Sequence, residues 1–170
     1  MRAPAAYPST PTRTPTAEQT PPPPPARLLF RRPRPLAATG RCLCGHIRFR
    51  LFDRLPPVGF CHCSQCRRAS GTGSNAVLNV RQDRFEWVGG EEQLRRFETA
   101  TGWSHTFCGG CGCPMPQPTP DGGRMFVPAG ALDGHPQLGI AGHIFVGDKP
   151  DWVMICDDAP RFDGHVEGAG

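Results

Sequence analysis

The sequence predicts a mainly β domain made of antiparallel sheets. Short runs in which apolar and polar residues alternate recur along most of the chain, and this alternation is the period of a half-buried strand. Turn signals such as Gly89-Gly90 and Asp133-Gly134 separate these runs. The 170 residues include 21 Pro, 21 Gly and 9 Cys, a composition that is typical of loop-rich, cross-linked folds and disfavours a helical bundle.

A single domain is expected, because a chain of this length has room for one core of ordinary size. Residues 1–38 form a low-complexity segment with an unbroken proline run, Pro21–Pro25, and are predicted to be a disordered Pro/Arg-rich tail. The folded domain is expected over residues 39–165, where the composition changes. Residues 166–170 are expected to be a short C-terminal tail.

The alternating pattern places the secondary structure elements in order. It starts at residue 39 and continues to residue 51, which predicts the first strands there. Further strands are predicted at residues 75–80, 84–88, 93–98, 104–107, 124–127, 143–146 and 152–155. One short helix is predicted, over residues 64–70.

The charge distribution argues against a nucleic-acid-binding domain. The formal net charge is +4, but residues 1–40 hold six Arg and one Glu, so the remainder of the chain is close to neutral at −1. The folded part also lacks the Arg-rich face interleaved with aromatic residues that a phosphate-tracking surface needs. The basic tail could still contact an acidic partner weakly.

The sequence favours a cytoplasmic protein without a membrane segment. No stretch of about 18 apolar residues is present, so a spanning helix is not expected. The first residues lack the apolar core of a secretory signal, and an odd number of cysteines fits poorly with a fully paired disulfide framework. In a reducing compartment, clustered thiols are more often metal ligands than bridges.

Seven of the cysteines predict two zinc sites. They lie in three clusters: Cys42-Leu43-Cys44, Cys61-His62-Cys63-Ser64-Gln65-Cys66 and Cys108-Gly109-Gly110-Cys111. Zinc takes about four tetrahedral ligands, and a closed four-thiolate site needs two cysteine pairs from distant segments. Cys42 and Cys44 with Cys108 and Cys111 would supply these pairs and would join the two halves of the domain.

The remaining cluster supplies only three ligands. Cys61, Cys63 and Cys66 would leave the fourth zinc position to water or to a substrate, and open coordination is the mark of a catalytic zinc. A neighbouring side chain could instead fill that position and make the second site purely structural. The candidates for this role are His62, His105 and Cys113.

Other residues near the clusters have two interpretations each. Arg67 and Arg68 would offset the net −1 charge of a three-thiolate zinc site and attract anionic groups of a ligand, or they form an ordinary solvated face. Cys113 is either an alternative to Cys108 or a spectator. Cys156 ends a strand-like run and is expected to be a small buried residue.

Five ordered motifs between about residues 39 and 165 resemble one known family. The motifs are GRCLCG at 40–45, CHCSQCRR at 61–68, FCGGCG at 107–112, AGALD at 129–133 and HIFV at 143–146. Together they resemble the glutathione-dependent formaldehyde-activating enzymes, a family that also includes centromere protein V. The long Pro-rich front and Cys113 lie outside the family pattern.

The resemblance implies a β-tent fold of layered antiparallel sheets stapled by zinc. It also implies that the structural ligands are Cys42, Cys44, Cys108 and Cys111 and that the catalytic ligands are Cys61, Cys63 and Cys66. The family's named reaction joins glutathione to formaldehyde as S-hydroxymethylglutathione, which is carbon–sulfur lyase chemistry in the synthetic direction. Arg67 or Arg68 could hold a glutathione carboxylate. His62 could shuttle the hemithioacetal proton or donate a hydrogen bond to sulfur.

Three functions follow from these observations. The first is a zinc-dependent enzyme that adds a low-molecular-weight thiol such as glutathione to formaldehyde or a small aldehyde, or reverses that reaction. The second is a non-catalytic zinc-binding scaffold or interaction module, and the third is a thiol or aldehyde sensor. The sequence leaves open whether the protein forms a homodimer.

Overall fold

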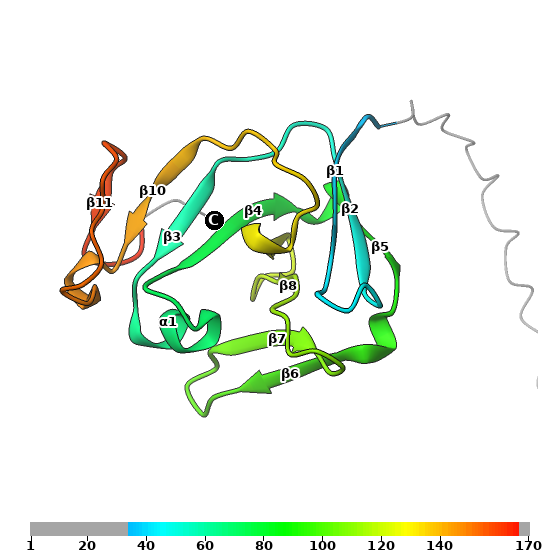
Figure 1. Cartoon of the computed structure of the whole chain (residues 1–170), viewed down its shortest axis with the longest axis horizontal. Helices are drawn as coiled ribbons and strands as arrows, with labels where there is room; N and C mark the ends of the chain where they lie inside the picture. The colour runs from blue at the N-terminus through cyan, green and yellow to red at the C-terminus, as the bar shows by residue number, and fades with distance from the viewer. Residues whose placement is uncertain (1–33, 167–170) are drawn as a thin grey trace, which may run out of the picture. The chain divides into compact units, whose positions relative to one another are not determined.

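The computed structural model describes residues 34–166, which fold into three β-sheets and one short α-helix (Figure 1). The mainly β class is therefore confirmed. The tail predicted over residues 1–38 lies almost entirely outside the described residues, as do residues 167–170. The first strand, β1, spans Leu36–Arg41.

The smaller of the two core sheets has the order β1-β2-β5 and is antiparallel throughout. Strand β2 spans Arg48–Phe52 and β5 spans Phe85–Gly89. In β2, the buried Phe49 and Leu51 alternate with the exposed Arg48 and Arg50. This is the half-buried pattern that the sequence predicts for a sheet with one face toward a core.

The larger sheet has the order β11-β10-β3-β4-β9-β8. Its strands are β3 (Val58–Cys61), β4 (Asn75–Arg81), β8 (Gln117–Pro118), β9 (Arg124–Pro128), β10 (Ile140–Ile144) and β11 (Arg161–Phe162). Strand β10 pairs in parallel with both β3 and β11, whereas the other pairs are antiparallel. The chain reaches β10 through a long connection after β9, which permits a parallel strand.

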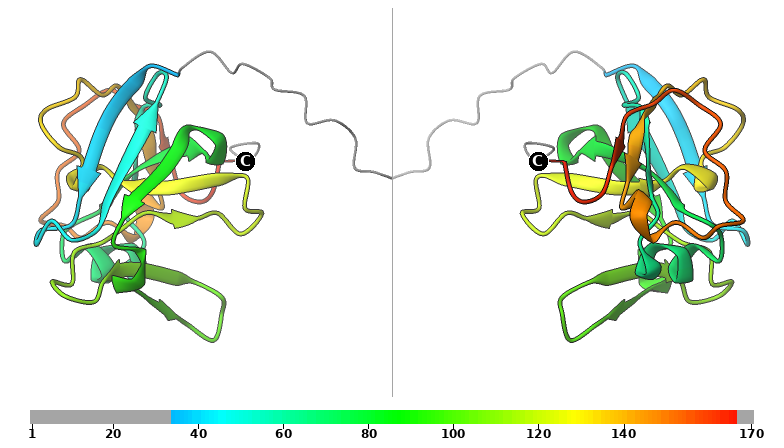
Figure 2. Two further views of the ribbon diagram at one scale, coloured as in Figure 1. Left: turned by 90° about the vertical axis from the view of Figure 1, so that its right-hand side faces the viewer. Right: turned by 90° about the vertical axis from the view of Figure 1, so that its left-hand side faces the viewer.

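A two-stranded hairpin and a helix complete the fold. Strands β6 (Leu94–Glu98) and β7 (Ser104–Cys108) pair antiparallel and extend from the lower end of the molecule (Figure 2). Helix α1 spans Ser64–Ser70, as predicted, and ends at Gly71 in the left-handed conformation. Four 3-10 turns connect strands, at Gln82–Arg84, Glu91–Gln93, Ala129–Ala131 and Val146–Asp148.

The hydrophobic core lies between the three-stranded sheet, called the smaller sheet here, and the six-stranded larger sheet. The smaller sheet contributes Phe49 and Leu51, and the larger sheet contributes Leu78, Val80 and Val127 to the same buried cluster. Full burial of each such side chain stabilises the fold by about 1.5–3 kcal/mol. The other face of β4, which alternates with Leu78 and Val80, is turned away from this core.

Two local predictions are wrong. Residues 152–155, predicted as a strand, form a turn and loop in which Trp152 and Met154 are exposed and no neighbouring strand is paired. Lys149 Nζ instead donates a hydrogen bond to the carbonyl oxygen of Val153 at 2.6 Å. Strand β10 lies earlier than predicted and ends at residue 144, because Phe145 has a positive φ of 56°.

Within residues 34–166, no helix combines the length and apolar character that crossing a bilayer requires.

Candidate functional site

Four cysteines from two distant segments converge at one end of the smaller sheet. Cys42 and Cys44 lie in the turn that follows β1, whereas Cys108 ends β7 and Cys111 lies in the turn beyond it. The sulfur atoms of Cys42 and Cys44 are 3.4 Å apart, and those of Cys44 and Cys108 are 3.8 Å apart. All four sulfur atoms lie within 4.8 Å of one another, so they can share one metal ion.

Backbone hydrogen bonds shape both turns and point amides at sulfur. The amide of Ile47 donates to Cys42 Sγ at 3.3 Å, and the amide of Gly112 donates to the carbonyl oxygen of Cys108 at 2.8 Å. Gly112 has φ +71°, which favours glycine there. A hydrogen bond from the backbone of Cys113 lowers the pKa of the Cys111 thiol to about 6, which favours the thiolate that a metal binds.

The second cluster is built by the end of one strand and the start of the helix. Cys61 is the last residue of β3, Cys63 is the N-cap of α1, and Cys66 lies in the first turn of α1. Their sulfur atoms lie within 4.8 Å of one another, and the amide of Cys66 donates to Cys63 Sγ at 3.4 Å. Cys61 is buried and the other two are half-buried.

Two of the three thiols, Cys61 and Cys66, differ in acidity. A hydrogen bond from the Cys66 thiol lowers the pKa of Cys61 to about 6, and the same interaction raises the pKa of Cys66. The lowered pKa favours the thiolate form of Cys61. Among the described residues, no fourth His, Cys, Asp or Glu donor joins this group, so His62, His105 and Cys113 do not complete it. Thiol sets of four and of three suit zinc, which prefers sulfur and nitrogen donors.

A buried histidine pair lies directly beside the three-thiol cluster. His62 and His143 are 2% and 4% exposed, and His62 Nε2 lies 2.9 Å from His143 Nδ1. His143 Nε2 lies 3.1 Å from Asp157 Oδ2, so the chain of contacts ends at a carboxylate. Burial lowers the pKa of His62, which favours its neutral form.

These contacts show what the ring nitrogens of His62 bind, and they add two residues, His143 and Asp157, to which the sequence analysis gave no role. The Nε2 atom of His62 faces His143, and its Nδ1 atom is buried without a partner among the described residues, so the hydrogen bond to sulfur is not formed. His143 appeared in the sequence only as part of the HIFV motif, and Asp157 carried no signal. Parallel pairing of β10 with β3, which sets His143 opposite Phe60, brings His143 to the site, and Asp157 reaches it from the loop before β11.

Comparison with known proteins decides the family. A sequence model described as glutathione-dependent formaldehyde-activating enzyme matches residues 37–148 of the chain. The chain belongs to this family. A curated relative from Halomonas elongata, named for the same enzyme, is 32% identical over an alignment of 126 residues, and the match covers 68% of this chain and 79% of the relative. A crystal structure of a Rhodobacter sphaeroides protein is 25% identical, with a TM-score of 0.48, and the match covers 57% of this chain and 89% of that chain.

In this family member the two arginines after the second cluster differ in environment. Arg67 is half-buried, and its Nε atom donates to the carbonyl oxygen of His62 at 3.1 Å. Arg68 is exposed. Arg67 thus links α1 to the cysteine-bearing turn through one nitrogen and keeps its two terminal nitrogens for other contacts.

The two remaining cysteines lie outside both clusters. Cys113 is half-buried, and its sulfur faces the carbonyl oxygen of Pro114 at 3.6 Å. Cys156 is exposed, so the prediction of a buried residue is wrong. The segment that carries Cys156 is a loop and not a strand, and it therefore has no sheet face to bury.

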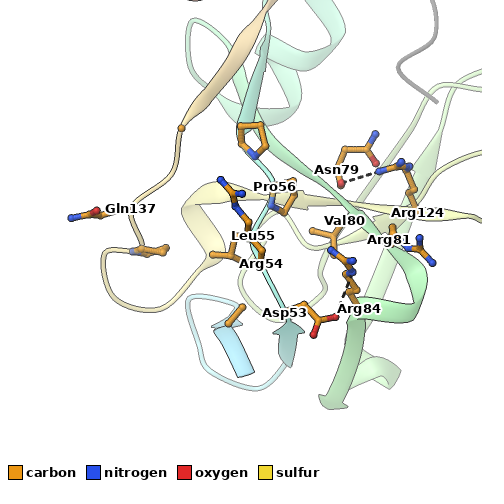
Figure 3. Close-up of a pocket in the computed structure, with 14 residues that line it drawn as sticks. Asp53, Arg54, Leu55, Pro56, Asn79, Val80, Arg81, Arg84, Arg124 and Gln137 are labelled. Carbon is orange, nitrogen blue, oxygen red and sulfur yellow. Dashed lines mark hydrogen bonds and ion pairs between the residues drawn. The ribbon is translucent and has the colours of Figure 1, made fainter. Parts of the chain in front are cut away.

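Two cavities border the larger sheet. One, of about 260 Å³, begins at Cys61 and runs over the outer face of β3 and β4. The other, of about 730 Å³, is lined by four arginines, Arg54, Arg81, Arg84 and Arg124, and lies at the far end of β4 (Figure 3). Pro57 and Asn79 line both cavities, which are therefore adjacent. Only the smaller cavity reaches a cysteine cluster.

Proposed function

We propose that this protein is a zinc-dependent enzyme of the carbon–sulfur lyase class. It joins a low-molecular-weight thiol, such as glutathione, to formaldehyde or another small aldehyde, or catalyses the reverse reaction, within a domain of residues 39–165. Family membership supports a thiol and an aldehyde as substrates. The observation that carries the proposal is a cluster of three thiols with no fourth protein donor among the described residues.

Two zinc ions per chain are proposed, one structural and one catalytic. The structural ion would be held by Cys42, Cys44, Cys108 and Cys111, and the catalytic ion by Cys61, Cys63 and Cys66. The fit is supported by sulfur atoms that lie within 4.8 Å of one another in each set. A zinc ion at the second set would supply a Lewis acid that favours the thiolate of a bound thiol and polarises a carbonyl.

The reaction balances without an oxidant or reductant. In the synthetic direction, the thiol sulfur forms a bond to the aldehyde carbon and the π bond of the carbonyl breaks. The proton of the thiol finishes on the carbonyl oxygen, which becomes a hydroxyl group. The reverse reaction breaks the carbon–sulfur bond and returns the proton to sulfur.

The remaining residues of the site bind and position. Arg67 and Arg68 are proposed to hold a carboxylate of the thiol, since guanidinium groups pair well with carboxylates. His62 is proposed as a positioning residue: its bond to His143 fixes the turn between Cys61 and Cys63. A fixed turn keeps the three sulfur atoms in one arrangement, as supporting hydrogen bonds do around metal sites.

Zinc content per chain tests this assignment. In Cys63→Ser we expect bound zinc to fall from about two to about one with the fold retained, because only the three-thiol site is broken. Cys156→Ser is the matched control, since Cys156 is exposed and outside both clusters, and it should keep the wild-type content. Unchanged zinc in Cys63→Ser would contradict the assignment.

Substrate contact is tested by replacing zinc with cobalt and titrating with glutathione. We expect the optical spectrum of the second site to change with thiol and that of the first site to stay the same. Cys63→Ser, which lacks the second site, should show no change. A wild-type spectrum indifferent to millimolar thiol would reject the enzyme and leave a zinc scaffold.

A further inference from the structure

The outer face of the larger sheet carries a groove that starts at Cys61. Val77 and Asn79 of β4 lie on this face, because they alternate with residues buried in the core. Gly59 pairs with Val77, and Phe126 pairs with Asn79, so both lie on the same face. The groove therefore follows the sheet from the three-thiol cluster toward the far end of β4.

The walls of the groove are mainly hydrocarbon. Val77, Phe126, Ile144 and Phe162 line its volume of about 260 Å³, and glycines of β3 and β10 form part of its floor. A peptide-like thiol would bury amide groups here without hydrogen-bond partners, which is costly. Formaldehyde is far smaller than the space. An apolar chain attached to the reacting carbonyl is the group that such a surface favours.

The far end of the groove is polar and positively charged. Arg124 Nη1 donates to the carbonyl oxygen of Asn79 at 3.5 Å, and Arg124 makes no ion pair among the described residues. Arg54, on the other side of the arginine-lined cavity, is exposed and likewise makes no ion pair within residues 34–166. By contrast, Arg81 is paired with Asp83. Two positive charges at this end, Arg54 and Arg124, therefore have no carboxylate partner within the part of the chain that the structure describes.

Asn79 lines both the apolar groove and the arginine-lined cavity, and in the cavity it lies beside Arg124 (Figure 3). Its Oδ1 atom is buried and has no hydrogen-bond partner among the described residues. This oxygen only accepts hydrogen bonds, so it pairs with a donor and not with an ionised carboxylate. The guanidinium groups beyond Asn79 are what suit a negatively charged group at the end of an apolar chain. Cys61 and Pro57 lie at the two ends of the groove and are four residues apart along one extended segment. Four residues of extended chain span about 13 Å, which is the length of the groove along this segment.

We propose that the groove binds an aldehyde whose apolar chain runs from a carbonyl at the Cys61 cluster to a carboxylate at Arg124. The inference rests on the addition reaction of the proposed function and extends its aldehyde substrate beyond formaldehyde, to a medium-chain aldehyde with a carboxylate at the other end. The addition itself is unchanged, with a new carbon–sulfur bond and the proton on the former carbonyl oxygen. The apolar chain of the substrate packs against the hydrocarbon walls of the groove. Its carboxylate pairs with the guanidinium group of Arg124.

The test compares four aldehydes with glutathione as the thiol: formaldehyde, butanal, octanal and 8-oxooctanoate, which is an eight-carbon aldehyde with a carboxylate at its other end. Butanal and octanal have similar intrinsic reactivity and differ in chain length. We expect kcat/KM to rise about four-fold for each methylene that the groove buries. The terminal carboxylate should add about a further five-fold, the size of a half-exposed ion pair. Equal or lower kcat/KM for both long aldehydes than for butanal would overturn the inference, whereas turnover of formaldehyde would show that the proposed function stands.

Two variants address the groove itself. A Cβ atom at Gly59 would meet only the carbonyl oxygen of Val77, at 4.0 Å, so Gly59→Val narrows the groove without straining the fold. It should lower the ratio of kcat/KM for octanal to that for formaldehyde at least ten-fold. Arg124→Met should remove the preference for the carboxylated aldehyde. Arg50→Met, on an exposed position of β2, is the matched control and should keep this preference.

Binding separates the inference from the proposed function if no aldehyde turns over. Octanedioate, a stable mimic of the carboxylated substrate, is then titrated into the zinc-loaded protein by calorimetry. Binding that weakens in Gly59→Val and in Arg124→Met supports the groove even though the enzyme assignment has failed. The inference is overturned if octanedioate does not bind. It is also overturned if glutathione binds and Gly59→Val blocks that binding, because the groove would then hold the thiol.

Discussion

Asp157 anchors the outer end of the buried histidine pair. Its carboxylate accepts a hydrogen bond from the amide of Ala159 at 2.9 Å and contacts His143 Nε2 through both oxygen atoms. The backbone hydrogen bond of Ala159, followed by His143, lowers the pKa of Asp157. A carboxylate with a lowered pKa stabilises the folded state only where it is ionised.

We therefore predict that Asp157→Asn destabilises the protein most above about pH 4, the ordinary pKa of an aspartate. The folded-state pKa lies below the unfolded one, so the stabilisation is present above the unfolded pKa and disappears as the pH falls through the folded pKa. Urea unfolding of both proteins between pH 3 and 7 measures it. Asp158→Asn, at an exposed neighbour, is the control. A difference that is constant with pH would contradict the prediction.

For individual residues, the sequence identified the candidate metal ligands but not the side chains that hold their turns in place. Cysteine spacing alone placed the thiols in two sets, because a Cys-x-x-Cys turn brings two sulfur atoms together locally. His62 and His143 are 81 residues apart, and their contact depends on which strands pair. Spacing carries no information about such a contact, so the histidine pair and Asp157 could not be found from the sequence.

Strand β1 packs so closely on β2 that one position admits no side chain. Gly40 pairs with Phe49, and a Cβ atom at Gly40 would overlap the Phe49 ring and lie 2.7 Å from the carbonyl oxygen of Ala131. The backbone at Ala131 cannot move easily, because Ala131 belongs to the buried core.

Gly40→Ala should consequently lower the free energy of unfolding by about 1–3 kcal/mol through overpacking. Gly130→Ala is a matched control, since a Cβ atom there meets nothing within 4 Å. Guanidinium denaturation of the reduced, zinc-loaded proteins gives both values. Equal stability of the two variants would show that β1 can shift away from β2.

Helices and strands with a strong local sequence pattern could be predicted. Strands whose position depends on pairing with distant strands could not. Helix α1 and strand β4 lie where periodicity predicted them, since capping and alternation are local properties. Strand β3 was not predicted, because its four residues are too few to show alternation. The segment 152–155 alternates without a partner strand and stays a loop.

On the scale of the whole molecule, the four-cysteine site joins the smaller sheet to the β6–β7 hairpin. Cys44 and Cys108 are 64 residues apart, and their sulfur atoms are 3.8 Å apart. A metal ion held there closes a long loop of the chain, and structural zinc contributes about 10 kcal/mol or more in small modules. This is comparable to the whole stability of an ordinary domain.

Cys108→Ser is accordingly expected to unfold the protein at room temperature, whereas Cys113→Ser should leave it folded. Both cysteines lie on the same segment, but only Cys108 belongs to a metal-binding set. Circular dichroism and a thermal melt with zinc present measure the effect. A native spectrum and an unchanged melt for Cys108→Ser would mean that the sheets hold together without this site.

The position of β10 has a consequence for synthesis. Strand β3 lies between β4 and β10, and β10 begins only at residue 140. Until the ribosome has added residues 140–144, the edge of β3 that later pairs with β10 has unpaired backbone N–H and C=O groups. Such unpaired edges can pair with strands of other chains. Nascent chains that stop short of residue 140 are therefore the form of this protein most in need of a chaperone.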